Sequence, residues 1–244
     1  MKLQKIIDVI EKIAPPELAC EWDNIGLMIG HADRDVEKAV ISLDFDENAL
    51  NCAIESKAEL IITHHPAIFK SLNSITDELI INAIKNDIAV YSAHTNFDSA
   101  VGGVNYALAD KIEMYNCLQC GMMRVGYINE DTFENVIKNI KNKLDVSALR
   151  VVGDMSKTIR KVAVLGGSGG DFVSEAFEQG CDLLITGECK YNQAQEAKRL
   201  GICVIAAGHF ETEYPAMGRL ADALRKRIDI EIVEARPKNV FRVI

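Results

Sequence analysis

Short apolar runs rich in β-branched residues alternate along the chain with amphipathic stretches, and this rhythm constrains the fold more than any other feature. Strands are expected at residues 39–43, 60–63, 89–92, 162–165, 183–186 and 203–206. Helical periodicity marks residues 3–14, 47–56, 77–86, 172–179 and 191–200. Strands that alternate with helices in this way are typical of a largely parallel α/β sheet flanked by helices.

The same rhythm occurs twice with similar residues. Segment 38–41 (KAVI) is similar to segment 161–164 (KVAV), and segment 58–63 (AELIIT) is similar to segment 181–186 (CDLLIT). The offset is 123 positions in both cases (161 − 38 and 181 − 58). Any two strand–helix–strand units share apolar strands, so chance similarity is the alternative. A constant offset over this length favours an internal duplication.

The repeat continues after a shortened connection. Residues 87–90 correspond to residues 201–204 at an offset of 114 (202 − 88), and the offset then becomes 115 (209 − 94). His94 and Asp98 therefore correspond to His209 and Glu213. We expect two similar α/β lobes with largely parallel sheets. Their predicted ranges are 1–115 and 116–244, with the boundary somewhere within residues 111–150.

Composition excludes several classes of protein. The chain has 27 basic and 36 acidic residues, a formal net charge of -9 and no basic cluster, so nucleic acid is not an expected partner. Its seven cysteines are irregularly spaced, which disfavours a disulfide framework. No apolar run reaches the roughly 18 to 20 residues of a membrane span, and the amphipathic start lacks a signal-cleavage site. We therefore expect a cytoplasmic protein without membrane contact.

Four of the five histidines lie where expected strands end. They are His64, His65, His94 and His209. The carboxyl ends of parallel strands form the ligand crevice of an open sheet, so these side chains could converge. Imidazole and carboxylate groups are natural ligands for a divalent transition metal. A lone histidine at such a place is more simply a hydrogen-bonded strand-end residue, but four of them with two carboxylates favour a metal site.

The spacing of these residues favours two ions over one. Consecutive residues of a strand point to opposite faces, so His64 and His65 would each serve a different ion. The carboxylates of Asp98 and Glu213 could bridge two ions about 3.5 to 4 Å apart. Pro215 suits the first position of a helix, which would place Glu213 on the approach to that helix and not on its surface.

A glycine-rich segment, GGSGG at residues 166–170, follows an expected strand and precedes an expected helix. Backbone N–H groups at such a place can hold an anion, and Gly167, Ser168 and Gly169 are the candidate phosphate contacts. The segment is neither a Walker loop nor a GxGxxG fingerprint. A tight strand-to-helix turn explains the same glycines without any ligand.

Several short motifs occur along the chain in one order. They are EWDNIGL (21–27), THHP (63–66), HTNFD (94–98), GGVN (102–105), GSG (167–169) and the GH pair at 208–209 with Glu213. Together they resemble the YbgI/Nif3-like family, whose members are commonly labelled GTP cyclohydrolase I type 2 homologues. The similarity extends over nearly the whole chain.

The resemblance implies a dinuclear metal centre between the two lobes and assembly into a homohexameric ring. The implied ligands of two divalent ions are His64, His65, Asp98, His209 and Glu213. His94 matches a position close to the metals, either as a ligand or behind the ligands. Zinc, iron, manganese, nickel and cobalt all suit these ligand types. Asn192 lies where many relatives have a histidine nearby, and an amide cannot take up a proton as imidazole does.

The implied function is that of a metal-dependent hydrolase. Two ions would lower the pKa of a bound water, and the hydroxide would attack a nucleotide-like substrate such as GTP, opening its imidazole ring with loss of formate. Glu21, Asp23 and His94 are the candidates for proton transfer. A non-catalytic metal carrier, or an interaction scaffold whose ions hold the lobes together, would use the same ligands, so the sequence leaves both classes open.

Overall fold

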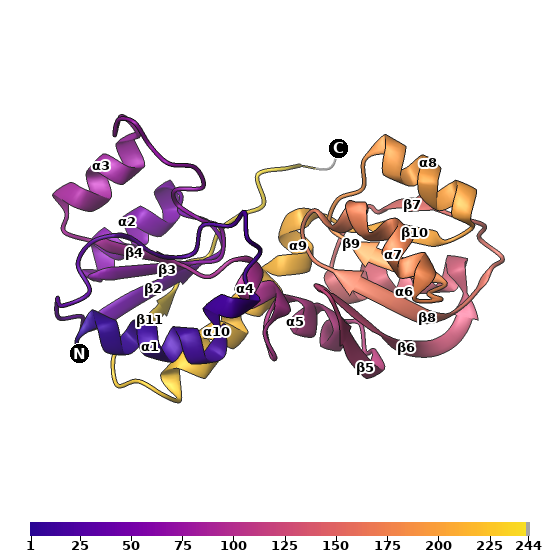
Figure 1. Cartoon of the computed structure of the whole chain (residues 1–244), viewed down its shortest axis with the longest axis horizontal. Helices are drawn as coiled ribbons and strands as arrows, with labels where there is room; N and C mark the ends of the chain where they lie inside the picture. Colours follow the sequence, from indigo (N-terminus) through magenta and orange to yellow (C-terminus); the bar gives the residue numbers. More distant parts are fainter. Residues whose placement is uncertain (243–244) are drawn as a thin grey trace. The chain divides into compact units, whose positions relative to one another are not determined.

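The computed structural model describes residues 1–242 and divides into two compact units (Figure 1). Unit 1 is formed by Met1–Gly103 and Met217–Asn239, and Val104–Ala216 forms the body of unit 2. The expected division into residues 1–115 and 116–244 differs from this one. The reason is that the chain returns to unit 1 after Ala216 and adds a strand to the first sheet.

Unit 1 is built on a five-stranded sheet with the order β1-β4-β3-β2-β11. Its strands are β1 (Gly26–Ile29), β2 (Lys38–Ser42), β3 (Leu60–Thr63), β4 (Ala89–Ser92) and β11 (Glu231–Glu234). Its helices are α1 (Leu3–Ile13), η1 (Pro16–Leu18), α2 (Glu47–Ser56), α3 (Glu78–Lys85), α4 (Thr95–Ser99) and most of α10 (Pro215–Arg225). β11 lies parallel to β2 with Ile232 opposite Ala39, whereas β1 is antiparallel to β4.

Helices cover both faces of this sheet. In Figure 1, α2 and α3 lie on one side of the strands, and α1 and α10 lie on the other. On the first side, Leu50 of α2 and Ile80 of α3 share a buried cluster with Val40, Ile61 and Val90 of the strands. A parallel strand that is buried on both faces needs a continuous apolar run, and this explains why these strands stand out in the sequence.

Unit 2 is built on a six-stranded mixed sheet with the order β5-β6-β8-β9-β10-β7. Its strands are β5 (Tyr115–Cys120), β6 (Met123–Thr132), β7 (Arg150–Val152), β8 (Thr158–Leu165), β9 (Leu183–Thr186) and β10 (Cys203–Ala206). Its helices are α5 (Val104–Lys111), α6 (Phe133–Leu144), η2 (Gly169–Phe172), α7 (Val173–Glu178), α8 (Tyr191–Leu200) and α9 (His209–Glu213). Within this sheet, β8, β9 and β10 run parallel to one another.

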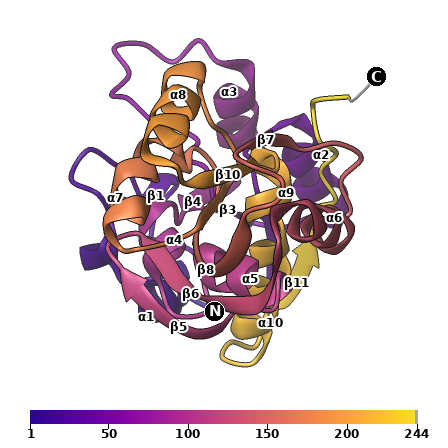
Figure 2. The same cartoon turned by 90° about the vertical axis from the view of Figure 1, so that its right-hand side faces the viewer.

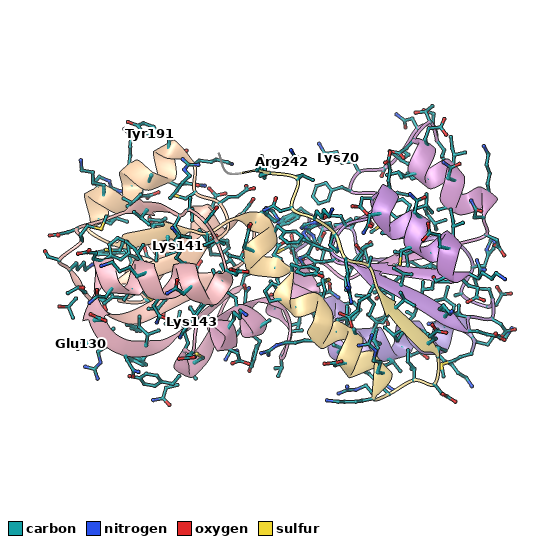
Figure 3. The ribbon with its side chains drawn as sticks, turned by 180° about the vertical axis from the view of Figure 1, so that it is seen from behind. Lys70, Glu130, Lys141, Lys143, Tyr191 and Arg242 are labelled. Carbon is teal, nitrogen blue, oxygen red and sulfur yellow. The ribbon has the colours of Figure 1, made fainter. Side chains whose placement is uncertain are left out.

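Two apolar clusters lie on opposite faces of the second sheet. α5 and α6 pack on one face, where Phe133 and Ile140 of α6 meet Val162 and Ile185. α7 and α8 pack on the other face (Figure 2). Polar residues occupy the outer sides of these helices, and Tyr191 at the start of α8 projects into solvent (Figure 3). Each unit thus has its own core.

The internal repeat is visible in the strand register. The paired residues are Ala39, Leu60 and Ala89 in unit 1, and Val162, Leu183 and Cys203 in unit 2. These residues correspond at the offsets found in the sequence, 123 for the first two strands and 114 for the third (203 − 89). An antiparallel edge strand completes each set, β1 beside β4 and β7 beside β10. The predicted α/β class with two similar lobes is therefore confirmed.

Some expectations about the connections differ from the structure. Residues 111–150 do not simply join the lobes, because they form β5, β6 and α6 of unit 2. β5 is mostly exposed, and only the first part of β6 is buried, so neither strand has the apolar run of a strand buried along its whole length. Within residues 1–242, no helix combines the length and the apolar character needed to cross a membrane.

Candidate metal centre

Three imidazole rings gather at the carboxyl ends of two neighbouring strands of unit 1. His64 and His65 follow the last residue of β3, and His94 lies between β4 and α4. The ring centroids of His64 and His65 are 5.0 Å apart, and that of His94 lies 5.1 Å and 5.7 Å from them. One ring nitrogen from each residue lies within 4.8 Å of the others. This group could hold a metal ion.

The argument that His64 and His65 point to opposite faces is wrong here. Strand β3 ends at Thr63, and the backbone N–H groups of both histidines donate to the carbonyl of Leu43, at 3.1 and 2.9 Å. The backbone has left the extended conformation, so the alternation of a strand does not apply. Both rings therefore reach the same cluster.

Each imidazole of this cluster is held at Nδ1 by an oxygen that can only accept a hydrogen bond. The pairs are His64 with the carbonyl of Ala93 (2.9 Å), His65 with Asp44 (2.6 Å) and His94 with Asp23 (2.8 Å). Nδ1 must therefore carry the proton in each neutral ring, which leaves the lone pair on Nε2. An imidazole oriented in this way is the usual form of a metal-binding histidine.

Asp23 is a buried carboxylate that acts through His94. Burial raises its pKa, but hydrogen bonds from His94 and Thr95 outweigh that effect and lower the pKa to about 2. Its side chain has no exposed surface. Asp23 is ionised at neutral pH and positions His94, so the geometry does not support a direct exchange of protons with a substrate. Glu21, the other carboxylate expected to transfer protons, is exposed in the turn before Asp23.

Asp98 extends the cluster from α4. It is 9% exposed, and its Oδ1 lies 3.5 Å from Nε2 of His64. Two ligand atoms that are each about 2.1 Å from one tetrahedral ion lie about 3.4 Å apart. His64 and Asp98 therefore have the spacing of two ligands of a single ion.

Unit 2 carries the corresponding pair, His209 and Glu213, on the single turn of α9. Nε2 of His209 lies 3.2 Å from Oε1 of Glu213, and Glu213 is only 3% exposed. As expected, a helix (α10) begins at Pro215 and Glu213 lies before it, but the approach to α10 is itself a helical turn. The chain forms α9 first and starts α10 at Pro215, so the two side chains are brought together by helical spacing.

His209 is also held at Nδ1, in this case by Glu188 at 3.1 Å. The Ser168 hydroxyl donates to the other carboxylate oxygen of Glu188 at 2.8 Å. The bonds from Ser168 and His209 hold the pKa of Glu188 below its ordinary value, although partial burial opposes them. In all four strand-end histidines, Nδ1 thus lies within hydrogen-bonding distance of an oxygen.

Sequence reasoning did not single out Asp44 or Glu188. Asp44 follows directly after the expected strand at residues 39–43, and Glu188 lies at the position equivalent to His65 in the repeat (188 − 65 = 123). Aligning the two halves around residues 63–66 and 186–189 would have drawn attention to Glu188. Nothing local marks Asp44 as the partner of a histidine 21 positions away.

The glycine-rich segment lies against the pair in unit 2. Gly167 has a φ of +61°, and a Cβ at this position would overlap Oε1 of Glu213 and lie 3.1 Å from Nε2 of His209. Only glycine combines this backbone conformation with so close an approach. Gly167 is therefore required by the side chains that it contacts.

The expected phosphate contact at this segment is not supported by its hydrogen bonds. The N–H of Gly167 donates to the hydroxyl of Thr212 at 3.0 Å, and the N–H of Gly169 donates to that of Thr186 at 2.9 Å. The Ser168 hydroxyl is bonded to Glu188. These donors are committed within unit 2, and a structural turn accounts for the glycines.

The fold and the site define an α/β protein with two equivalent units, each of which carries histidine and carboxylate groups at its strand ends. The geometry of these groups suits a metal ion. The chain belongs to the Duf34/NIF3 (NGG1p interacting factor 3) family, whose model matches residues 1–239. The resemblance seen in the sequence is confirmed.

Individual relatives agree with this assignment over the full length. The chain is 37% identical to the GTP cyclohydrolase 1 type 2 homolog of Clostridium perfringens over 262 aligned residues, which cover 100% of both proteins. It is similar to a solved Bacillus cereus protein related to NIF3, with a TM-score of 0.94, 25% identity and coverage of 100% and 99%. It is also similar to reduced HcgD from Methanocaldococcus jannaschii, with a TM-score of 0.85, 30% identity and coverage of 96% and 98%.

Proposed function

We propose that the chain is a dinuclear, divalent-metal-dependent hydrolase that acts on a nucleotide-like substrate. The proposed ligands of the two ions are His64, His65, Asp98, His209 and Glu213. One observation carries the proposal: Nδ1 of each proposed histidine ligand, His64, His65 and His209, lies within hydrogen-bonding distance of an oxygen of its own unit, which leaves Nε2 available as the ligand atom. The combination of ligands from both units rests on the internal repeat and on the family.

Two divalent ions, when bound, lower the pKa of water and supply a nucleophile for hydrolysis near neutral pH. The protein contributes position and charge. The carboxylates of Asp98 and Glu213 offset the repulsion between two cations. His94 is assigned to proton transfer at Nε2, because the ionised Asp23 at its Nδ1 stabilises the imidazolium that forms when it accepts a proton.

GTP is the proposed substrate, on the strength of the name of the Clostridium perfringens relative. Hydrolytic opening of the guanine imidazole ring would leave a formamide, and hydrolysis by a second water would release formate from it. A fold and its metal ligands do not by themselves define a substrate, so the choice of GTP rests on that name alone.

Metal analysis of protein purified without added metal, followed by a GTP turnover assay, tests this proposal. His65→Ala should lose bound metal and GTP hydrolysis together. His31→Ala is the matched control, because His31 is an exposed histidine outside the cluster, and this variant should retain both properties. Wild-type protein without metal would overturn the proposal. Bound metal without turnover of GTP would favour the non-catalytic metal carrier or scaffold.

We also propose that the chain forms a homo-oligomer, specifically a hexamer. The family resemblance supports this assembly, and closed symmetry is the usual outcome for soluble homo-oligomers. Light scattering after size-exclusion chromatography should give six times the monomer mass of 26.9 kDa. A mass near that of the monomer across micromolar concentrations would refute the assembly and leave the metal-site proposal intact.

A further inference from the structure

Two large aromatic side chains stand beside His94 and are only partly buried. Trp22 is 61% exposed and Phe69 is 47% exposed. Their ring centroids are 6.0 Å apart with planes inclined at 53°. The ring of His94 lies 6.3 Å from Trp22 and 6.4 Å from Phe69, at 73° and 82° to them. All three residues belong to unit 1.

The fold brings these rings together from separate segments. Trp22 lies in the turn before β1, whereas Phe69 lies in the connection between β3 and α3. Asp23, the residue after Trp22, is fixed by hydrogen bonds from His94 and Thr95. The backbone that carries Trp22 is therefore anchored to the histidine cluster, and the indole stays next to it.

Packing alone does not explain this arrangement. Aromatic rings contribute most to folding when they are buried, and these two rings contact each other while a large part of their surface faces solvent. Exposed apolar surface of this kind marks a binding site when it adjoins a functional group. Here the adjoining group is His94, whose ring nitrogen belongs to the candidate metal cluster.

We propose that Trp22 and Phe69 bind the planar heterocyclic ring of the substrate and hold it beside His94. The inference rests on the proposed function and names the substrate class as nucleotides with a purine base. A planar ring can stack on the exposed face of Trp22, and the inclined Phe69 ring then offers an edge contact. Stacking on aromatic side chains is tolerant of base identity, so both GTP and ATP should bind.

Trp22 is the single tryptophan of the chain, so its fluorescence reports directly on this site. We expect GTP and ATP to quench the fluorescence of the protein as purified in a saturable manner. Inorganic tripolyphosphate carries the same kind of charge without a ring and should not quench it. Absence of saturable quenching by both nucleotides would overturn the proposal, as would equal quenching by tripolyphosphate.

The affinities of variants for GTP, measured by equilibrium dialysis, separate the loss of stacking from the effect of removing any exposed aromatic side chain. Trp22→Ala should weaken GTP binding about 5- to 100-fold, whereas Trp22→Phe should recover most of that loss because it retains an aromatic face. Phe69→Ala should weaken binding by a smaller factor. Phe177→Ala is the matched control, because Phe177 is 44% exposed on α7, and it should bind GTP like the wild type. Wild-type affinity in Trp22→Ala would overturn the proposal.

Two parallel measurements keep this inference distinct from the proposed function. If GTP quenches Trp22 but is not hydrolysed, the aromatic site stands and the hydrolase proposal fails. If Trp22→Ala retains metal and hydrolyses GTP with an unchanged KM, the hydrolase proposal stands and the aromatic site fails. The neighbouring Leu72 and Ile75 are also exposed, as an interface between proteins would require. A changed oligomeric mass of Trp22→Ala with unchanged GTP affinity would therefore assign the surface to an interface and overturn the proposal.

Discussion

Gly167→Ala should impair metal binding far more than it impairs folding. The new Cβ would overlap Oε1 of Glu213 and approach Nε2 of His209 to 3.1 Å. Oε1 is the end of a flexible side chain, so the overlap is relieved by displacing the carboxylate and not by moving the backbone. Glu213 is buried, and its displacement removes a proposed ligand from its place beside His209.

The size of the expected change follows from separating two effects of Gly167→Ala, the backbone strain at positive φ and the displacement of Glu213. An alanine with positive φ costs about 1 to 2 kcal/mol relative to glycine, whatever its surroundings. Displacement of a group that positions or ligates a metal typically lowers metal affinity about 10- to 100-fold. Gly201→Ala isolates the first effect, because Gly201 has a φ of +76° and a Cβ added there would meet no atom within 4 Å.

Urea unfolding of the metal-free proteins and calorimetric titration with Zn²⁺ measure the two effects. Both variants should lose a similar free energy of unfolding, about 1 to 2 kcal/mol. Only Gly167→Ala should lose Zn²⁺ affinity, by at least about tenfold. Equal Zn²⁺ affinity in the two variants would refute the placement of Glu213 at the metal. Loss of Zn²⁺ binding in Gly201→Ala as well would show that strain alone is responsible.

Three further predictions concern Asp23, Glu188 and the core. Because the pKa of Asp23 falls from its ordinary 3.8 to about 2, the ionised group should add about 2 kcal/mol of stability above pH 4 that is lost as the pH falls through 2. In urea unfolding, the difference in unfolding free energy between wild type and Asp23→Asn should therefore be larger at pH 6 than at pH 2.5. The same difference at both pH values would contradict this prediction. Glu188→Gln should lower Zn²⁺ affinity about 10- to 100-fold, and Glu178→Gln, at an exposed site on α7, should not. Ile185→Ala, at a fully buried site in β9, should cost about 2 to 5 kcal/mol of unfolding free energy, and a loss well below that would show that the site can collapse.

The parallel strands were predictable because burial on both faces imposes a local signature. The expected strands at residues 60–63, 89–92, 183–186 and 203–206 coincide with β3, β4, β9 and β10. The antiparallel strands were not predicted, because they lack this signature of burial on both faces. β5 is mostly exposed, and its pairing with β6 depends on the neighbouring strand and not on its own residues.

The ends of the histidine-bearing strands show where sequence reasoning stops. The position of His64 and His65 after an apolar run was visible, but their shared direction depends on two N–H bonds to Leu43. Likewise, helical spacing of His209 and Glu213 could be read only once α9 was known to precede α10. In each case a single turn of backbone decides where the side chains point, and no local propensity is strong enough to specify a single turn.

The sequence by itself determined the α/β class, the repeat and the set of candidate ligands, since each is carried by residue type and spacing along the chain. Only the tertiary structure decided which oxygens hold the imidazoles and which rings stand beside them. Asp23 lies 71 positions from His94, and Glu188 lies 21 positions from His209. Glu188 and His209 meet because the neighbouring parallel strands β9 and β10 end at the same edge of the sheet, whereas Asp23 reaches His94 because the antiparallel strand β1 begins beside the end of β4.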